Sequence, residues 1–138
     1  MTGFLLDTNV LSETIRSNPE QRVVDWLVDQ QDDSLFLSVL TIGELEKGIA
    51  SVKDSKRKAT LRRWLDDEIK VIFAGRILPI DQKTSTTWGK TLAAAGRPLP
   101  AIDSLLAATA LQHGLTFVTR NTKDVSSTGV ECLNPWER

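Results

Sequence analysis

The sequence predicts an α/β protein in which helices cover both faces of a central, mostly parallel β-sheet, giving an α/β/α sandwich. Short apolar runs alternate along the 138 residues with longer segments of helical periodicity, which is the pattern of β-α-β units. Hydrophobic residues make up 41% and charged residues 25%, as in ordinary globular proteins. No repeat, low-complexity tract or linker divides the chain, so we expect one domain over residues 1–138.

In the first half of the chain, apolar runs predict strands over 4–6 and 35–37, and periodic segments predict helices over 20–30, 41–52 and 56–73. The first of these strands is apolar throughout, so we expect it to be buried on both faces. Pro19 fits the start of the first helix. Leu45 and Ile49 are spaced four residues apart, which places both toward the core side of the second.

In the second half, the same reasoning predicts strands over 77–80, 116–118 and 131–133, and helices over 85–95 and 101–113. Pro79 lacks a backbone N–H, so the strand that contains it is expected at a sheet edge. Asp81 is a natural N-cap for the helix that follows. Gly114 is a natural C-terminal glycine for the last helix.

Composition argues against several classes of protein. The single Cys132 cannot form a disulfide within the chain, and the single His113 cannot build a zinc site. Met1–Leu6 lacks the basic and long apolar regions of an export signal, and no apolar run approaches a membrane span. We therefore expect a cytoplasmic protein without a membrane partner. The net charge of −1 gives no sign of nucleic-acid binding, although acids that hold a metal would lower this total.

Oxygen-bearing side chains follow the predicted strands. Asp7 comes directly after the first strand, and Glu44 lies in the helix after the second. Asp103 lies in the first turn of helix 101–113, and Asn121 and Asp124 follow strand 116–118. Ligands of parallel sheets bind beyond the carboxyl ends of the strands, where these side chains would meet. Hard divalent ions such as Mg²⁺ prefer oxygen ligands, and they can activate water for attack on a phosphodiester.

Each of these residues also has a structural explanation, and the residues alone leave both open. Asp7 could cap the next helix. Glu44 could reach back to the amide of Thr41 in a capping box. Asp103 could interact with the helix dipole, and the two side chains after residues 116–118 could belong to a turn.

Two other groups of residues favour structural roles. The basic run is expected to be a solvated helix face, with RNA contact as the alternative; it comprises Lys53, Lys56, Arg57, Lys58, Arg62 and Arg63. The four tryptophans are expected in the core or in an interface; they are Trp26, Trp64, Trp88 and Trp136.

Four segments, taken in order, resemble the motifs of PIN-domain proteins. They are residues 4–12 (FLLDTNVLS), 38–45 (SVLTIGEL), 103–110 (DSLLAATA) and 118–124 (VTRNTKD). Any one of them is a weak signal, but together they cover essentially the whole chain. Residues 73–79 (FAGRILP) and the ending Asn134-Pro135-Trp136 are similar to the VapC branch, nearest its FitB-like members.

This resemblance implies a PIN-like fold and the function of an endoribonuclease toxin that depends on Mg²⁺, for which Mn²⁺ substitutes. It implies a homodimer that a VapB-like antitoxin neutralises, usually by placing a basic or aromatic side chain in the acidic pocket. Carried over residue by residue, Asp7, Glu44 and Asp103 are the metal-binding and catalytic acids. Many relatives carry Asp at the position of Asn121, so Asn121 and Asp124 are expected only as supporting groups.

The resemblance also implies contacts to the substrate, and other functions stay open. Thr8 would help to orient water, and Arg97 and Arg120 would attract RNA. A phosphatase with Asp7 as nucleophile is one alternative, although Asn9 and Leu11 depart from its Asp-x-Asp-x-Thr pattern. The other is a PIN-fold nucleic-acid-binding module with little or no nuclease activity. Single-stranded DNA is a further candidate substrate.

Overall fold

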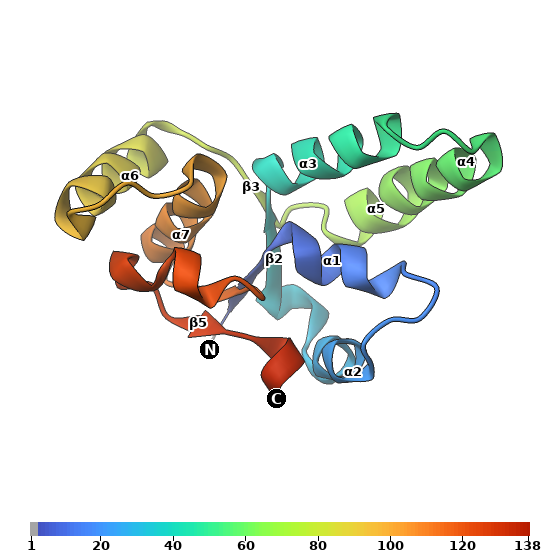
Figure 1. Ribbon diagram of the computed structural model, residues 1–138, viewed down its shortest axis with the longest axis horizontal. Helices are drawn as coiled ribbons and strands as arrows, with labels where there is room; N and C mark the ends of the chain where they lie inside the picture. Colours follow the sequence, from blue (N-terminus) through green and yellow to red (C-terminus); the bar gives the residue numbers. More distant parts are fainter. Residues whose placement is uncertain (1–2) are drawn as a thin grey trace.

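The computed structural model describes residues 3–138 and contains one five-stranded sheet in the order β3-β2-β1-β4-β5 (Figure 1). The strands are β1 (Phe4–Leu6), β2 (Leu35–Ser38), β3 (Ile77–Leu78), β4 (Thr116–Val118) and β5 (Cys132–Leu133). Every neighbouring pair is parallel. Helices flank the sheet on both sides, which confirms the predicted α/β/α sandwich. Because β1 is central, the residues after it lie at the middle of the carboxyl edge.

In Figure 1, helices α1 to α5 lie on one side of the sheet, and α6 and α7 lie on the other. Their bounds are α1 (Thr8–Thr14), α2 (Gln21–Asp29), α3 (Val39–Ala50), α4 (Ser55–Arg63), α5 (Lys70–Ile72), α6 (Gln82–Ala95) and α7 (Ala101–His113). A π-helical segment, η2 (Trp64–Ile69), joins α4 to α5. Short 3₁₀ turns are η1 (Asp32–Ser34), η3 (Thr122–Asp124), η4 (Ser126–Thr128) and η5 (Pro135–Glu137). Among the helices of residues 3–138, none combines the length and apolar character needed to cross a membrane.

Two apolar clusters form the core, one on each face of the sheet. Successive residues of a strand point to opposite faces, so Leu6 packs with Val10 and Val23 while Leu5 packs with Ala107. All five of these side chains are fully buried. Strand β1 is therefore covered on both faces, as its continuous apolar sequence predicts.

Helix α3 begins at Val39, two residues before the predicted start. Ser38 ends β2 and caps the helix, because its hydroxyl accepts the Leu40 N–H at 3.0 Å. Thr41 consequently lies inside the first turn, fully buried. The predicted capping box between Thr41 and Glu44 is therefore wrong, and helix capping does not explain the presence of Glu44 at this position.

The second half of the chain agrees more closely. Helix α7 and strand β4 have the predicted bounds, and Gly114 follows α7 with a φ of 65°. Asp81 caps α6 as predicted, but the helix starts at Gln82 rather than at residue 85. Strand β3 is at the sheet edge and stops before Pro79, which cannot donate to a ladder. The region 56–73 is helical throughout but is divided by η2, and α1 was not among the predicted helices.

Candidate active site

Asp7 is fixed at the carboxyl edge by β1 and β4 together. Its own N–H donates to the Val118 carbonyl at 2.9 Å. The Thr119 hydroxyl donates to Asp7 Oδ2 at 2.7 Å, and the Thr8 N–H donates to Oδ1 at 2.7 Å. Asp7 is only 5% exposed and Thr119 is fully buried. Asp7 therefore does cap α1, but the same carboxylate also faces the site.

Glu44 reaches the same place from α3. The Thr8 hydroxyl donates to Glu44 Oε1 at 2.5 Å, and Thr41 Oγ1 lies 3.3 Å from Thr8 Oγ1. Thr8 directly follows Asp7, so this contact joins the acid of α3 to the end of β1. Glu44 is exposed to solvent and has no role in the helix cap, which leaves its carboxylate available to a ligand.

Asp103 is the third residue of α7 and is partly buried. Pro100 precedes the helix without a side-chain cap, and within residues 3–138 the Asp103 carboxylate makes no hydrogen bond. Burial raises the pKa of Asp103, and the charges of Asp124 and Glu44 raise it further. Its negative charge is thus close to other acids and has no local partner.

The acids from separate segments interact electrostatically. Burial raises the pKa of Asp7 from its ordinary value of 3.8 to about 6. The hydrogen bonds from Thr119 and Thr8 partly offset this rise, whereas the charges of Asp103 and Glu44 add to it. Four acids from different parts of the chain therefore contribute to one negative field at the carboxyl edge.

The carboxylates of this cluster do not converge on a single point as the ligands of a bound ion would. Among residues 3–138, no three His, Cys, Asp or Glu side chains have the geometry of a metal site. Both Asp7 oxygens and one Glu44 oxygen accept protein hydrogen bonds. The donor set itself is composed of oxygens and carries excess negative charge, which fits a hard cation such as Mg²⁺ or Mn²⁺.

The two supporting candidates are at the rim. Asn121 and Asp124 are exposed and border η3, and the Asp124 N–H donates to the Asn121 carbonyl at 3.1 Å. The Asn121 N–H donates to Thr119 Oγ1 at 3.0 Å, but its side chain does not cap η3. Asp124 influences the site through its charge on Asp103. Both residues lie at the edge of the cluster.

Two polar residues near Asp7, Thr119 and Asn9, were not predicted from the sequence as part of the site. Thr119 holds Asp7, but nothing in the sequence shows that residues separated by 112 positions are in contact. Asn9, two residues after Asp7, has a buried Oδ1 atom that accepts no hydrogen bond from residues 3–138. Its place in the segment Asp7-Thr8-Asn9 was the available signal.

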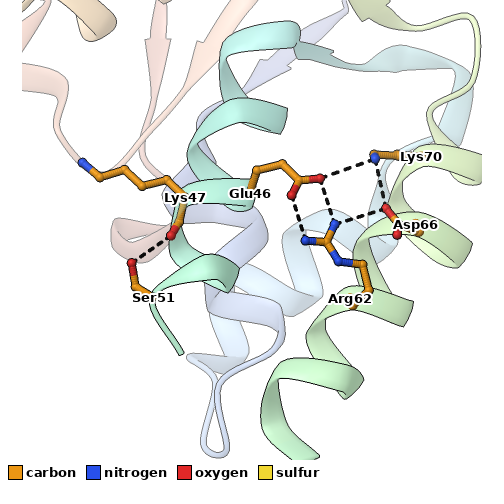
Figure 2. Close-up of polar contacts among 6 residues, drawn as sticks. All are labelled: Glu46, Lys47, Ser51, Arg62, Asp66 and Lys70. Carbon is orange, nitrogen blue, oxygen red and sulfur yellow. Dashed lines mark hydrogen bonds and ion pairs between the residues drawn. The ribbon is translucent and has the colours of Figure 1, made fainter. Parts of the chain in front are cut away.

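Part of the predicted basic run is already neutralised. Figure 2 shows Arg62 paired with Glu46 at 2.8 Å, while Lys70 pairs with Asp66 at 2.9 Å. This ion-pair network joins α3 to α4, η2 and α5, and it lies away from the Lys47 side chain. Arg57 is also engaged, since it donates to the Ile15 carbonyl at 3.2 Å. Most of the basic run is exposed, which confirms the solvated helix face that its structural explanation predicted. Arg62 and Arg57 also join this helix to other elements.

A mainly apolar groove of about 230 Å³ runs beside the acidic cluster, between α1, α3 and α4. Ser12, Ile15, Leu45, Leu61 and Trp64 line it, and Thr8 and Glu44 form its end nearest Asp7. The groove therefore opens onto the acids. Its mainly apolar lining is the kind of surface that apolar side chains of an amphipathic helix can contact.

A protein family, known relatives and solved structures match nearly the whole chain. Residues 4–128 match the PIN domain family. Toxin FitB of Neisseria gonorrhoeae is 40% identical over 136 residues, which cover 96% of this chain and 98% of FitB. VapC ribonuclease Y4jK of Sinorhizobium fredii is 35% identical over 137 residues, covering 97% and 98%. The crystal structure of FitAcB from Neisseria gonorrhoeae has a TM-score of 0.94 at 39% identity, covering 98% of this chain and 99% of that one.

Proposed function

Because this chain belongs to the PIN-domain family, in the group that contains toxin FitB and the VapC ribonucleases, we propose that it is a Mg²⁺-dependent endoribonuclease toxin. The observation that carries the proposal is the convergence of Asp7, Glu44 and Asp103 at the carboxyl edge, where burial and, to a lesser extent, neighbouring carboxylates raise the pKa of Asp7 and Asp103. A cluster of this kind favours a divalent cation. The proposed substrate is RNA and the proposed place of action is the cytoplasm.

In this proposal Asp7, Glu44 and Asp103 hold the ion, and Mn²⁺ can replace Mg²⁺. When bound, the ion would activate a water molecule and stabilise charge on the scissile phosphate. The Thr119 and Thr8 hydrogen bonds fix both oxygens of Asp7 and favour its ionised form. Thr8 also holds Glu44 close to Asp7. Asp124 adds negative charge at the rim, and the neutral Asn121 adds none.

The proposal includes a partner. The apolar groove ends at Glu44, so a helical segment lying in it could deliver a basic side chain to the acids. A VapB-like antitoxin has this chemistry according to the family resemblance, and we propose one as the neutralising partner of a homodimeric toxin. Production of the chain alone should slow growth, and co-production of the antitoxin should relieve the effect. Asp7→Asn should be harmless and still bind the antitoxin.

Incubation of the purified protein with mixed RNAs tests the activity. We expect cleavage with Mg²⁺ or Mn²⁺, none with EDTA, and a loss of roughly a hundredfold or more in Asp7→Asn and Asp103→Asn. Asp67→Asn is the matched control, because Asp67 is an exposed acid on η2 outside the cluster. Cleavage that persists in EDTA, or in Asp7→Asn, would reject the metal mechanism.

The same assay distinguishes the alternatives. A non-cleaving nucleic-acid-binding module is favoured by the neutral Asn121, and it would bind RNA without cutting it under any metal condition. Parallel reactions with single-stranded DNA and with p-nitrophenyl phosphate test the remaining two. Hydrolysis of the phosphate monoester alone would identify a phosphatase that uses Asp7 as nucleophile.

A further inference from the structure

A polar pocket of about 530 Å³ lies on a different face of α1 from the apolar groove. Residues from the end of α1 to the start of α2 line it, together with residues that follow β4 and β5 and residues of η5. Among its lining side chains are Arg16, Arg22, Arg120, Asn134 and Trp136. The pocket therefore combines three guanidinium groups with an aromatic ring. These side chains belong neither to the acidic cluster nor to the lining of the apolar groove.

Arg120 connects this pocket to the acidic cluster. It directly follows Thr119, which donates to Asp7. Its guanidinium carbon lies 5.2 Å from the centre of the Trp136 ring, and that ring is 7% exposed and thus rigidly packed. Asn134 Nδ2 donates to the Arg120 carbonyl at 3.4 Å. Within residues 3–138 the guanidinium itself has no ion pair and donates no hydrogen bond, so its donors are held in place and free.

The other two arginines of the pocket have partners but stay accessible. Arg16 pairs with Glu13 at 3.2 Å, and Arg22 pairs with Glu20 at 2.6 Å. The side chains of Arg16 and Arg22 remain 62% and 56% exposed. Glu13 is buried, and its carboxylate also accepts the Glu20 N–H at 2.8 Å, so its hydrogen-bonding capacity is largely used within the protein.

Three glutamates also line the pocket, and of these only Glu137 forms no ion pair within residues 3–138. The lining as a whole is therefore balanced between three arginines and three glutamates, and only the position beside Arg120 offers a cation without a carboxylate partner.

We propose that this pocket binds the ribose-phosphate backbone of the substrate RNA, with Arg120 as the principal phosphate contact. The inference rests on the proposed function, because it concerns the path of the same substrate. A planar guanidinium presents paired N–H groups that match phosphate oxygens, and stacking on Trp136 reduces the entropy lost on binding. Helix α1 has seven residues and is about 10 Å long, so the pocket lies within a few nucleotides of Asp7.

Binding without cleavage tests this proposal. A labelled 12-nucleotide RNA of mixed sequence is titrated into Asp7→Asn in EDTA at several KCl concentrations. Adding Arg120→Gln should weaken binding about three- to tenfold and lower the slope of log K against log salt by about 0.7, the value for one phosphate contact on a single strand. Arg63→Gln, which removes the same charge from an exposed position on α4, should change both quantities much less.

A second variant is expected to tighten RNA binding, a result that misfolding could not produce. Glu137→Gln removes an opposing charge from the pocket lining and should tighten RNA binding about twofold or more. Equal effects of Arg120→Gln and Arg63→Gln would show that only net charge matters and would overturn the proposal. Unchanged RNA affinity with weakened antitoxin binding would assign the pocket to the protein partner, and would overturn it too. The binding measurement involves neither metal nor cleavage, so it is independent of the nuclease assay. If the wild-type chain cleaves RNA while either of these two results is obtained, the pocket proposal fails and the nuclease proposal does not.

Discussion

Asp7 is both the cap of α1 and a member of the acidic cluster at the carboxyl edge. It accepts the Thr8 N–H as the cap of α1, and it also lies in the field of Glu44 and Asp103. A cap needs one carboxylate oxygen, and the other oxygen is held by the Thr119 hydroxyl. The two explanations are compatible because the N-terminus of α1 begins at the carboxyl edge of the sheet.

Asp7→Asn should remove a pH dependence of stability. The pKa of Asp7 is raised from 3.8 to about 6, so the folded protein binds this proton more tightly than the unfolded chain. Asp7 therefore lowers the free energy of unfolding as pH rises from about 4 to 6. Each pKa unit corresponds to about 1.4 kcal/mol, which gives a loss on the order of 2–3 kcal/mol at pH 7. The nearly isosteric amide has no such loss.

The measurement is urea unfolding of the metal-free protein in EDTA between pH 4 and pH 8. We expect Asp7→Asn to match the wild type near pH 4 and to exceed its stability above pH 6. Asp67→Asn serves as the control and should follow the wild-type curve. An Asp7→Asn protein less stable than wild type at pH 7.5 would mean that the capping role outweighs the repulsion.

Substitutions at Asn121 and Asp124 should show whether the acidic cluster needs a further carboxylate to bind metal tightly. Asn121→Asp adds a carboxylate beside Thr119 and should tighten Mn²⁺ binding several-fold or admit a second ion. We expect Asp124→Asn to weaken Mn²⁺ binding about two- to threefold, the loss of a nearby charge, since Asp124 is exposed and its charge acts on Asp103. Calorimetric titration of both variants measures affinity and stoichiometry. Identical values in both variants and in wild type would place η3 outside the site.

At the scale of elements, the predictions were best where side chains mark both ends. Helix α7 lies between Pro100 and Gly114, and both residues restrict where a helix can begin and end. The start of α3 was missed because Val39 and Leu40 continue the apolar run of strand β2, and Val39 is a β-branched residue that favours strands. The π-helical register of η2 has no local signal, since its sequence has the apolar spacing of an ordinary helix.

Ser38→Ala should destabilise the protein by about 1 kcal/mol, because the cap of α3 loses the acceptor for the Leu40 N–H. Urea unfolding measures the change, and Ser127→Ala, at an exposed position in η4, is the matched control. RNA cleavage should persist, since the rest of α3 still carries Glu44. Unchanged stability would mean that water replaces the hydroxyl at the helix end.

At the scale of the whole molecule, the net charge conceals how charge is distributed. Acids gather at the carboxyl edge, while the free guanidinium of Arg120 lies in the neighbouring pocket. The sequence motifs predicted which acids would converge, because parallel strands place their carboxyl ends together. The pocket beside Arg120 could not be predicted, since Trp136 meets Arg120 only through the pairing of β4 with β5.

Divalent metal should stabilise the whole fold, because the ion binds the assembled cluster and the unfolded chain has none. A ligand at a hundred times its Kd adds about 2.7 kcal/mol, which for a chain of this length corresponds to roughly 10 °C in Tm. The ion competes with the proton on Asp7, whose pKa is about 6, so the rise in Tm should be larger at pH 7.5 than at pH 5. Thermal unfolding with Mn²⁺ and with EDTA measures it, and Asp7→Asn should lose the rise while Asp67→Asn keeps it. A Tm that is indifferent to millimolar Mn²⁺ at pH 7.5 would contradict a metal site at this edge of the sheet. An equal rise in Asp7→Asn would place the ion elsewhere in the protein.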